Sequence, residues 1–159
     1  SFSDYAHMPI PEEERFDIVK LLKRSINIYI NNREIEFHTD IPNEDIHVVG
    51  DPNWIGRSVS NLIINGIQAV EKGIKPVIHL SLKETTQNRV LITVEDNGKG
   101  IPEEIREKVF MPNFSTKYSG SGIGLAITKR AVEHAGGKLW FDTKIGIGTS
   151  FYIELPVMS

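Results

Sequence analysis

The sequence predicts a two-layer α/β sandwich, in which a mixed, mostly antiparallel sheet carries helices on one face. Two patterns support this prediction, since some segments alternate apolar and polar residues as strands do, and others repeat apolar residues at helical spacing. The two kinds of segment follow one another without strict strand-helix-strand alternation, which argues against a purely parallel sheet. The 159 residues, 40% hydrophobic and 25% charged, suffice for one soluble domain with one core.

The start of the chain is predicted to be a connection to another domain. Residues 1–14 are polar, contain two prolines and show no sustained period, so they are typical of a tether. We expect residues 1–11 to be a linker from a preceding domain outside this chain, and residues 12–159 to form one domain.

The first half of that domain is predicted to contain two helices and two short strands. Asp17 can cap the first helix, because apolar residues recur at helical spacing after it. A longer helix is predicted from Asp51 to about Lys72, where Gly73 and Pro76 stop it. The two strands are expected between these helices, in residues 33–42 and 46–51.

The second half is predicted to contain two hairpins and two further helices. Residues 77–84 alternate apolar and polar side chains, and residues 89–95 repeat the alternation after a short Thr-Gln-Asn turn. A helix is predicted at residues 101–110, because Pro102 stands at its start and acidic residues fill its first turn. The last predicted elements are a helix at residues 123–137, closed by two glycines, and a hairpin of residues 138–143 and 148–156.

The composition excludes several functional classes. A net charge of −3 and a pI of about 6.0 give no general attraction to nucleic acid or anionic lipid, so no nucleic-acid partner is expected. The absence of cysteine rules out disulfides and thiolate zinc sites and suits a reducing compartment. No apolar run approaches the roughly 20 residues of a membrane span. We expect a cytoplasmic fragment that is not itself membrane-inserted, from a longer protein whose membrane anchoring stays open.

Three amides form a stripe on the long predicted helix. Asn61, Asn65 and Gln68 stand at positions i, i+4 and i+7, with apolar residues on the other faces. Such a stripe can bind a hard cation through oxygen or a phosphate through nitrogen. A solvated surface is the alternative, although Lys and Glu, which are typical of a surface, do not occur between Arg57 and Glu71.

Two glycine-rich stretches add further candidate binding groups. In DNGKGIP, Asp96 at a strand end can accept a hydrogen bond from an amino group, and the glycines admit a flat ring close to the backbone, although a plain turn would use the same residues. In GSGIGLAI, glycines precede a helix whose N-terminus can hold an anion. This second stretch is neither a dinucleotide fingerprint, which needs glycine at Leu125, nor a Walker loop, which needs Lys-Ser/Thr after its last glycine.

Taken together, five motifs resemble the ATP-binding catalytic domain of two-component sensor histidine kinases, within the GHKL ATPase superfamily. NLIINGIQA resembles the N box, DNGKGIP the first glycine box, VFMPNFSTK the F box, GSGIGLAI the second glycine box, and GTSF the last motif. The resemblance covers roughly residues 12–157. It implies the Bergerat-type form of the predicted sandwich and the activity of a protein histidine kinase.

The resemblance also implies roles for single residues. Asp96 would read the adenine amino group, helped by Thr149 and ordered water. Asn65 would coordinate Mg²⁺ bridging the phosphates, with Asn61 in support, and Lys117 would be the phosphate cation of the lid. Catalysis is thus assigned to Asn61, Asn65 and Lys117. The other residues implied at the nucleotide are Phe110 and Phe114, as anchors of the lid, and Gly98, Gly100, Ile101, Thr116, Gly120, Ser121, Gly122, Gly124 and Leu125.

The sequence departs from the family pattern at the helix and at the lid. Gly66 stands where the N box usually has alanine, and a glycine inside a helix is less favourable by up to about 1 kcal/mol. Met111 replaces the usual acidic residue of the F box, Asn113 replaces a common aromatic residue, and the segment from Phe114 to Gly120 is short. These differences bear on how the lid orders and opens.

The implied function is transfer of the γ-phosphate of Mg-ATP to a histidine on a dimerisation and phosphoacceptor domain of the same or a partner chain, for relay to a response regulator receiver domain. That histidine is expected outside this chain. The helix of an acceptor histidine is not predicted at His7, which precedes Met-Pro, and His134 stands near a helix end. The other three, His38, His47 and His79, lie in or beside predicted strands.

Two alternative functions stay open. One is a nucleotide-binding regulatory module, either a degenerate kinase or an anti-sigma-like partner binder, without phosphotransfer. The presence of Asn65, Asp96 and Lys117 argues against degeneracy. The other is an ATP-driven clamp of the gyrase, mismatch-repair or heat-shock chaperone kind. Those proteins carry a glutamate one helical turn before the magnesium asparagine, where this chain has Asn61, so hydrolysis is disfavoured.

Overall fold

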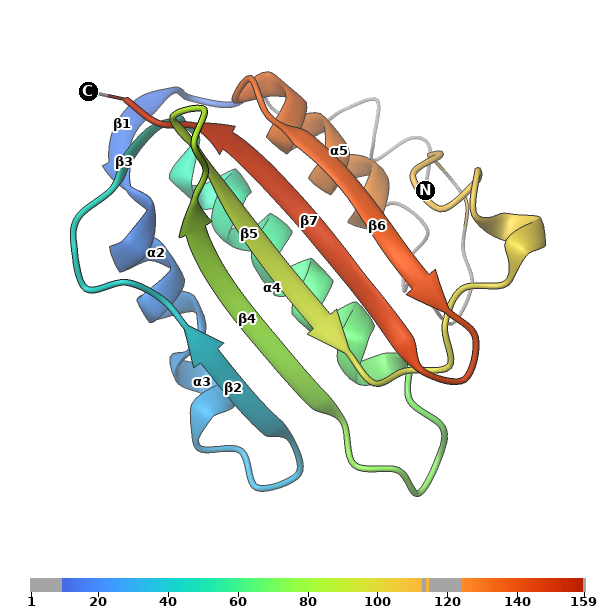
Figure 1. Cartoon of the computed structure of the whole chain (residues 1–159). Helices are drawn as coiled ribbons and strands as arrows, with labels where there is room; N and C mark the ends of the chain where they lie inside the picture. Colours follow the sequence, from blue (N-terminus) through green and yellow to red (C-terminus); the bar gives the residue numbers. More distant parts are fainter. Residues whose placement is uncertain (1–9, 113, 115–123, 159) are drawn as a thin grey trace.

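A single twisted sheet of five strands forms one layer of the domain (Figure 1). The computed structural model describes residues 10–112, 114 and 124–158 of the 159-residue chain. Within these residues β2 pairs with β4 in parallel, and every other pair in this sheet is antiparallel. The predicted mixed, mostly antiparallel sheet is therefore confirmed. The strands lie in the order β2 (Glu36–Asp40), β4 (Val77–Glu84), β5 (Arg89–Asp96), β7 (Gly148–Pro156) and β6 (Lys138–Lys144).

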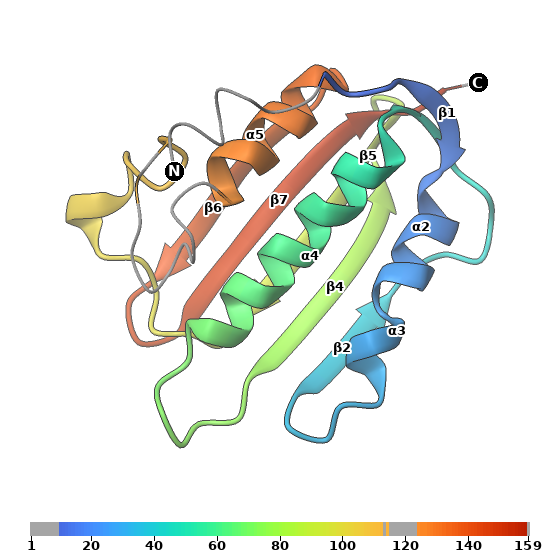
Figure 2. The ribbon, with the colours of Figure 1, turned by 180° about the vertical axis from the view of Figure 1, so that it is seen from behind.

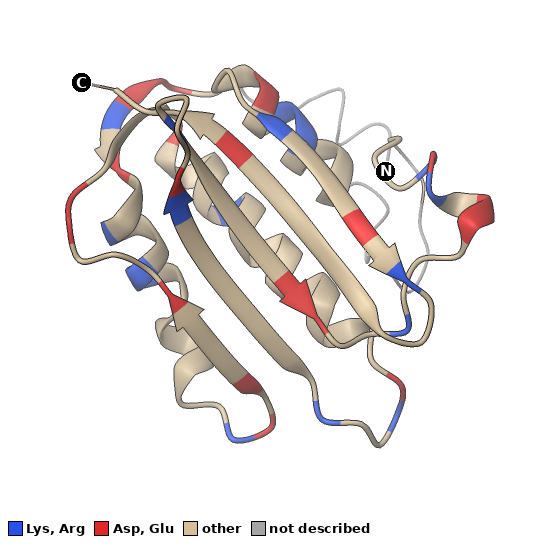
Figure 3. Ribbon diagram, viewed as in Figure 1, with Lys and Arg blue, Asp and Glu red and all other residues tan. Residues whose placement is uncertain are grey.

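Four described helices cover one face of this sheet, which Figure 2 shows from behind. They are α2 (Ile18–Ser25), α3 (Asn27–Ile30), α4 (Pro52–Gln68) and α5 (Gly124–His134). On the other face the described residues place no helix, and both acidic and basic residues occur along the strands (Figure 3). The predicted two-layer sandwich is confirmed.

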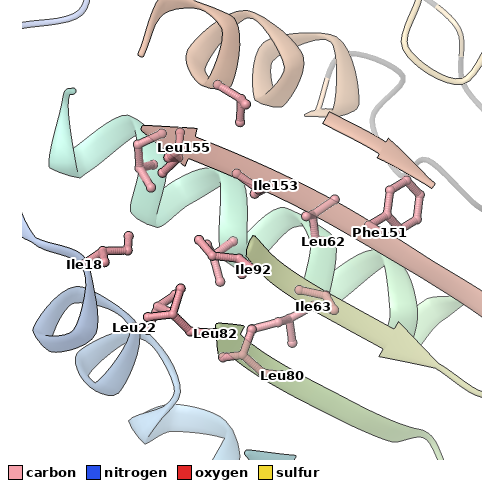
Figure 4. Packing of buried hydrophobic residues seen from close by; sticks show 14 of the residues in the cluster. Ile18, Leu22, Leu62, Ile63, Leu80, Leu82, Ile92, Phe151, Ile153 and Leu155 are labelled. Atoms are coloured by element: carbon pink, nitrogen blue, oxygen red, sulfur yellow. The ribbon is translucent and has the colours of Figure 1, made fainter. Parts of the chain in front are cut away.

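The core fills the space between sheet and helices. Alternate residues of the central strands, such as Leu80, Ile92 and Ile153, are at most 1% exposed and belong to one cluster with Leu62 and Ile63 of α4 (Figure 4). Because strand side chains alternate between the two faces, the intervening residues point away from the helices. The core therefore fixes α4 against β4, β5 and β7, and holds the ends of these elements at one edge of the domain.

A small second sheet joins the incoming chain to the core. β1 (Glu14–Asp17) pairs antiparallel with β3 (His47–Gly50). The strand in residues 46–51 was predicted, but β1 was not, and the tether predicted to residue 14 was too long by one residue. Just before β1, the backbone N–H of Glu12 donates to Asp51 Oδ2 at 2.7 Å, and the Glu13 carboxylate lies 3.4 Å from His134 Nε2.

Two predicted helices are shorter in the structure. α4 ends at Gln68 rather than near Lys72, because the Ala69 carbonyl accepts a bond from Lys99 N (2.9 Å) instead of continuing the helix. The helix predicted at residues 101–110 is wrong: only the 3-10 turn η1 (Glu103–Ile105) forms there. The backbone hydrogen bonds around it join residues three apart, as in a 3-10 turn, and Arg106 Nε donates to the Ile101 carbonyl oxygen at 3.0 Å. The bonding pattern of an α-helix, between residues four apart, does not form there.

Candidate functional site

Asp96 is the last residue of β5 and lies against Gly66 of α4. Its side chain is 7% exposed. Asp96 Oδ1 accepts two backbone hydrogen bonds, from Gly98 N at 2.8 Å and from Thr149 N at 3.2 Å. Among the described residues the structure gives Oδ2 no hydrogen-bond partner. One carboxylate oxygen is therefore held by the protein, while the other is available to a donor from outside.

Burial changes the acidity of this carboxyl group. Desolvation raises the pKa of Asp96 to about 6, aided by the nearby charge of Glu95, while the bonds from Gly98 and Thr149 act in the opposite direction. The group is therefore mainly ionised at pH 7, although the loss of hydration destabilises its charged form. A buried carboxylate with one unpartnered oxygen is suited to accept a hydrogen bond from a neutral amino group.

The loop after Asp96 is held between α4 and the β6–β7 turn. A Cβ on Gly98 would lie 2.5 Å from Ala69 Cβ, and one on Gly100, whose φ is +84°, would lie 2.6 Å from the Lys144 carbonyl oxygen. Both positions therefore require glycine because other parts of the protein approach closely. The sequence analysis gave a different reason, the approach of a flat ring, and that role stays a prediction.

Thr143 is a site residue that the sequence analysis missed. Its Oγ1 accepts from Ile101 N at 2.9 Å and lies 2.8 Å from Thr149 Oγ1. It connects the loop after β5 to the predicted adenine helper Thr149. Thr143 ends the strand predicted at residues 138–143, but its place opposite Thr149 depends on the register of the hairpin, which only the structure shows. Gly148 was also missed, and a Cβ there would collide with the Asp96 carbonyl oxygen.

The three amides of the α4 stripe differ in burial. Asn65 is 6% exposed, Asn61 is half-buried and Gln68 is exposed. Within the described part of the chain no hydrogen bond to the Asn65 amide is found, and neither of its atoms is a fully buried atom without a partner, a description that fits only Asp17 Oδ2 there. Asn65 is next to Gly66, whose Cβ position is only 3.0 Å from Asp96 Cβ. The structure therefore brings the predicted metal residue and the predicted adenine residue to one end of the sheet.

The predicted lid residues are only partly described. Phe110 packs edge-on against Phe141 and Phe151, with ring centroids 5.8 and 6.4 Å apart, so it contacts the core. Phe114 is half-buried. Ile101 and Leu125 are 4% and 2% exposed and belong to the core, so their side chains pack inside the protein. Gly124 opens α5. The predictions for Thr116, Lys117, Gly120, Ser121 and Gly122 lie outside the described residues.

A cavity of about 620 Å³ is lined in part by residues of the candidate site, namely Asp96, Thr143 and Thr149. Its lining includes His79, Glu95, Asp142 and Ser150, which form a row across four strands and alternate with core residues. Asn65 does not line it. The cavity therefore adjoins the Asp96 end of the candidate site, and it does not include the amide that is predicted to bind magnesium.

Comparison with known proteins identifies the family. Residues 50–159 match the family described as histidine kinase-, DNA gyrase B- and HSP90-like ATPase. The chain belongs to this ATPase family. Among curated proteins it is similar to sporulation kinase B of Bacillus subtilis, with 31% identity over 98% of this chain and 36% of that protein. It is also 36% identical to the adaptive-response sensory kinase SasA of Prochlorococcus marinus, over 79% of this chain and 35% of that protein.

The structure of this family member is similar to solved structures of kinase catalytic domains. The catalytic domain of histidine kinase ThkA superposes with a TM-score of 0.77 and 31% identity, covering 91% of this chain and 97% of that one. The mycobacterial sensor histidine kinase MprB gives a TM-score of 0.77 at 29% identity, covering 92% and 98%. The resemblance inferred from the five motifs is thereby confirmed.

The chain spans about a third of the length of the curated relatives, 35% and 36% for the two kinases above. Across residues 10–112, 114 and 124–158, the structure has no helix that is both long and apolar enough to cross a membrane.

Proposed function

We propose that this ATPase-family domain is the catalytic domain of a sensor histidine kinase, which binds Mg-ATP and donates the γ-phosphate to a histidine on a separate helical domain of the same or a partner chain. From there the phosphate passes to the receiver domain of a response regulator. A similar kinase, ThkA, has been solved in complex with a response regulator, with a TM-score of 0.79 and 28% identity, covering 99% of this chain and 45% of that one. In this proposal the domain is residues 12–159, the linker is residues 1–11, and the location is the cytoplasm.

The observation that carries the proposal is the Asp96 carboxylate. Its Oδ1 is held by two backbone N–H groups, and its Oδ2 has no partner among the described residues. The exocyclic amino group of adenine is the donor that would complete this arrangement. Thr149, which is connected through Thr143 to the loop backbone, would assist directly or through water.

The phosphates would extend from this carboxylate along α4. Asn65 carries a buried amide without a described partner, and an amide oxygen is a suitable ligand for Mg²⁺, which also takes phosphate oxygens and water. No group of three or more acidic, histidine or cysteine residues in the described part of the chain can hold a metal alone, which fits a metal that arrives with the nucleotide. Bound there, Mg²⁺ would neutralise phosphate charge. Asn61 would support Asn65 from the preceding turn.

The remaining residues of the proposed site are assigned through the family. Lys117 and Thr116 would contact the phosphates from the lid, and the glycine-rich segment before α5 would present backbone N–H groups to them. That segment contributes Gly120, Ser121, Gly122 and Gly124, the last of which begins α5. Gly98, Gly100 and Ile101 would shape the base pocket, Phe110 and Phe114 would anchor the lid, and Leu125 would contribute its backbone.

Transfer to histidine is favoured over hydrolysis by the residue at position 61. Clamp ATPases need a carboxylate at this position to remove a proton from the attacking water. The neutral amide of Asn61 cannot act as that base. The domain would therefore hold and orient the γ-phosphate until an acceptor histidine approaches.

Incubation with labelled ATP tests this function. Alone, the domain should remain unlabelled and release little phosphate, because it supplies a donor site without an acceptor. With a histidine kinase dimerisation domain added, acid-labile, base-stable label should appear on that domain. Nucleotide binding without any transfer would instead support the regulatory module, and rapid phosphate release by the domain alone would support the clamp.

A further inference from the structure

The hydroxyl group of Thr143 lies at the centre of a short chain of polar groups. The backbone N–H of Ile101 donates to Thr143 Oγ1 at 2.9 Å, the Thr149 hydroxyl oxygen lies 2.8 Å from it, and the Gly148 carbonyl oxygen lies 3.4 Å from it. Thr143 belongs to β6, Gly148 and Thr149 belong to β7, and Ile101 belongs to the loop after β5. Thr149 is 5% exposed, so the protein rather than bulk water orients its hydroxyl group.

The distances around Thr143 determine where its proton goes. A hydroxyl group has one proton to donate and two lone pairs that accept. The N–H of Ile101 can only donate, so it uses one lone pair of Thr143. The Thr149 oxygen lies at the usual O–H···O distance, 2.8 Å, whereas the Gly148 carbonyl oxygen, at 3.4 Å, is beyond that range. Thr143 therefore donates its proton to Thr149.

The direction of this bond determines what Thr149 can offer to a ligand. Its oxygen accepts from Thr143, and no other bond to its hydroxyl group is found in the described part of the chain. The proton of Thr149 is thus available to an acceptor outside the protein. The Thr149 backbone N–H donates to Asp96 Oδ1 at 3.2 Å, so this hydroxyl group lies near the carboxylate. Both residues line the cavity of about 620 Å³.

We propose that Thr143 is a positioning residue that makes Thr149 a hydrogen-bond donor to the bound base. The chain of bonds runs from the N–H of Ile101 through Thr143 to Thr149, and it ends at a ring nitrogen that accepts. The inference rests on the proposed function, since it takes the bound base to be adenine. It adds a requirement that Asp96 does not impose, namely an unprotonated ring nitrogen next to the amino-bearing carbon, which in adenine is N1.

Two nucleotides that differ at this ring atom test the proposal. ADP has the N1 acceptor, whereas 1-deaza-ADP has a C–H group there and keeps the amino group. Both are titrated by calorimetry into wild type, Thr143→Val and Thr143→Ser. Thr143→Val should weaken ADP binding about three- to tenfold, the effect of one hydrogen bond, and 1-deaza-ADP binding by less than about twofold. Thr143→Ser keeps the hydroxyl group and should retain the wild-type ratio of the two affinities. An unchanged ratio in Thr143→Val overturns the proposal.

A double-mutant cycle separates this role from a structural one. Thr143→Val also removes the acceptor of the Ile101 N–H, which by itself could disturb the loop after β5. In the Thr149→Val background no hydroxyl group is left to receive the Thr143 proton, so adding Thr143→Val should change ADP affinity by less than about twofold. If the loss there is as large as in the wild-type background, Thr143 acts through Ile101 alone and the proposal is wrong.

If Thr143→Val does not fold, wild type alone provides the test. Because hydrogen bonds in a chain polarise one another, the amide proton of Ile101 should move to lower field in NMR spectra when ADP binds, and less when 1-deaza-ADP binds. Equal shifts with the two ligands contradict the proposal.

The proposed function is tested separately by Asp96→Asn. If wild type binds ADP and Asp96→Asn does not, while Thr143→Val keeps the wild-type ratio, only the role of Thr143 fails. If wild type does not bind ADP, the proposed function fails and this inference fails with it.

Discussion

At the scale of single residues, the proposed role of Asp96 is accompanied by a loss of stability. Its folded pKa of about 6 exceeds the ordinary aspartate value of 3.8, so the native state binds the proton more tightly than the unfolded chain does. The group therefore favours folding most below pH 4, and this contribution is lost as pH rises through about 6. At neutral pH the buried charge opposes folding by up to about 3 kcal/mol.

Asp96→Asn should consequently abolish nucleotide binding without unfolding the domain. Asparagine retains an oxygen for the N–H groups of Gly98 and Thr149, but its amide nitrogen cannot accept from adenine. At pH 8 the nucleotide-free variant should be more stable than wild type, with a gain that shrinks as pH falls below about 6. Calorimetry with ADP and denaturant unfolding at several pH values measure both effects. Wild-type ADP affinity in the variant would contradict the adenine assignment.

Nucleotide affinity should depend on pH through the same group. Protonation of Asp96 removes the negative acceptor, so ADP binding should weaken as pH falls through about 6, approaching tenfold per pH unit below it. Inosine diphosphate carries the same titrating phosphates and provides the correction for them. The ratio of the two affinities should fall toward acid pH, and a constant ratio from about pH 5 to 7.5 would show that Asp96 does not titrate against adenine.

Asn65→Ala should separate metal binding from base binding. Because adenine recognition belongs to β5 and the amide to α4, the variant should bind nucleotide nearly normally in EDTA. With Mg²⁺ it should lose most of the metal-dependent gain in ATP affinity and should not phosphorylate an acceptor domain. Gln68→Ala, an exposed amide on the same helix, is the control. Full magnesium enhancement in Asn65→Ala would place the metal elsewhere.

At the scale of elements, α4 depends on its N-terminal cap. Asp51 Oδ1 accepts from Asn53 N at 3.0 Å and from Trp54 N at 3.3 Å, and Oδ2 accepts from Glu12 N at 2.7 Å. One buried carboxylate thus caps the helix that carries the amides and ties the incoming chain to it.

Asp51→Ala should therefore destabilise the domain by about 2 kcal/mol or more, since the helix cap and the bond to Glu12 are both lost. Asp51→Asn keeps an oxygen for the cap and should recover much of that stability. Guanidinium unfolding of wild type and both variants measures the difference. Equal stability of Asp51→Ala and wild type would mean that these bonds contribute nothing net.

Sequence patterns predicted most elements, because period and capping are local properties. β4, β5, β6, β7, α2 and α4 all follow the expected periods, and Asp17 and Asp51 cap helices as residue type suggests. The helix at residues 101–110 was wrong although Pro102 and two acids favour a helix start. Non-local contacts determine the backbone conformation of these residues, because Val109 is buried and Phe110 packs on β6 and β7. β1 was missed because its pairing partners lie at least 30 residues away along the chain.

At the scale of the whole molecule, the motifs predicted which residues gather but not how they are held. Asp96, Asn65 and Thr149 come from β5, α4 and β7, and the order of motifs along the chain indicated that they meet. The bonds from Gly98 and Thr149 to one oxygen of Asp96, and the link through Thr143, depend on strand register. Register is set by the packed sheet, so a single sequence could not provide these details.

The contacts of Glu12 and Glu13 also fix the point at which the chain enters the domain. Glu12 is bonded to the start of α4, and Glu13 lies beside the end of α5, so the entry point moves with the two helices that border the site. Eleven residues precede Glu12, and a fully extended segment of that length spans at most about 40 Å. Any group attached ahead of Ser1 is therefore confined to a sphere of about that radius around the start of α4. Within it, a donor and an acceptor on one chain would meet at millimolar effective concentration without any affinity between them.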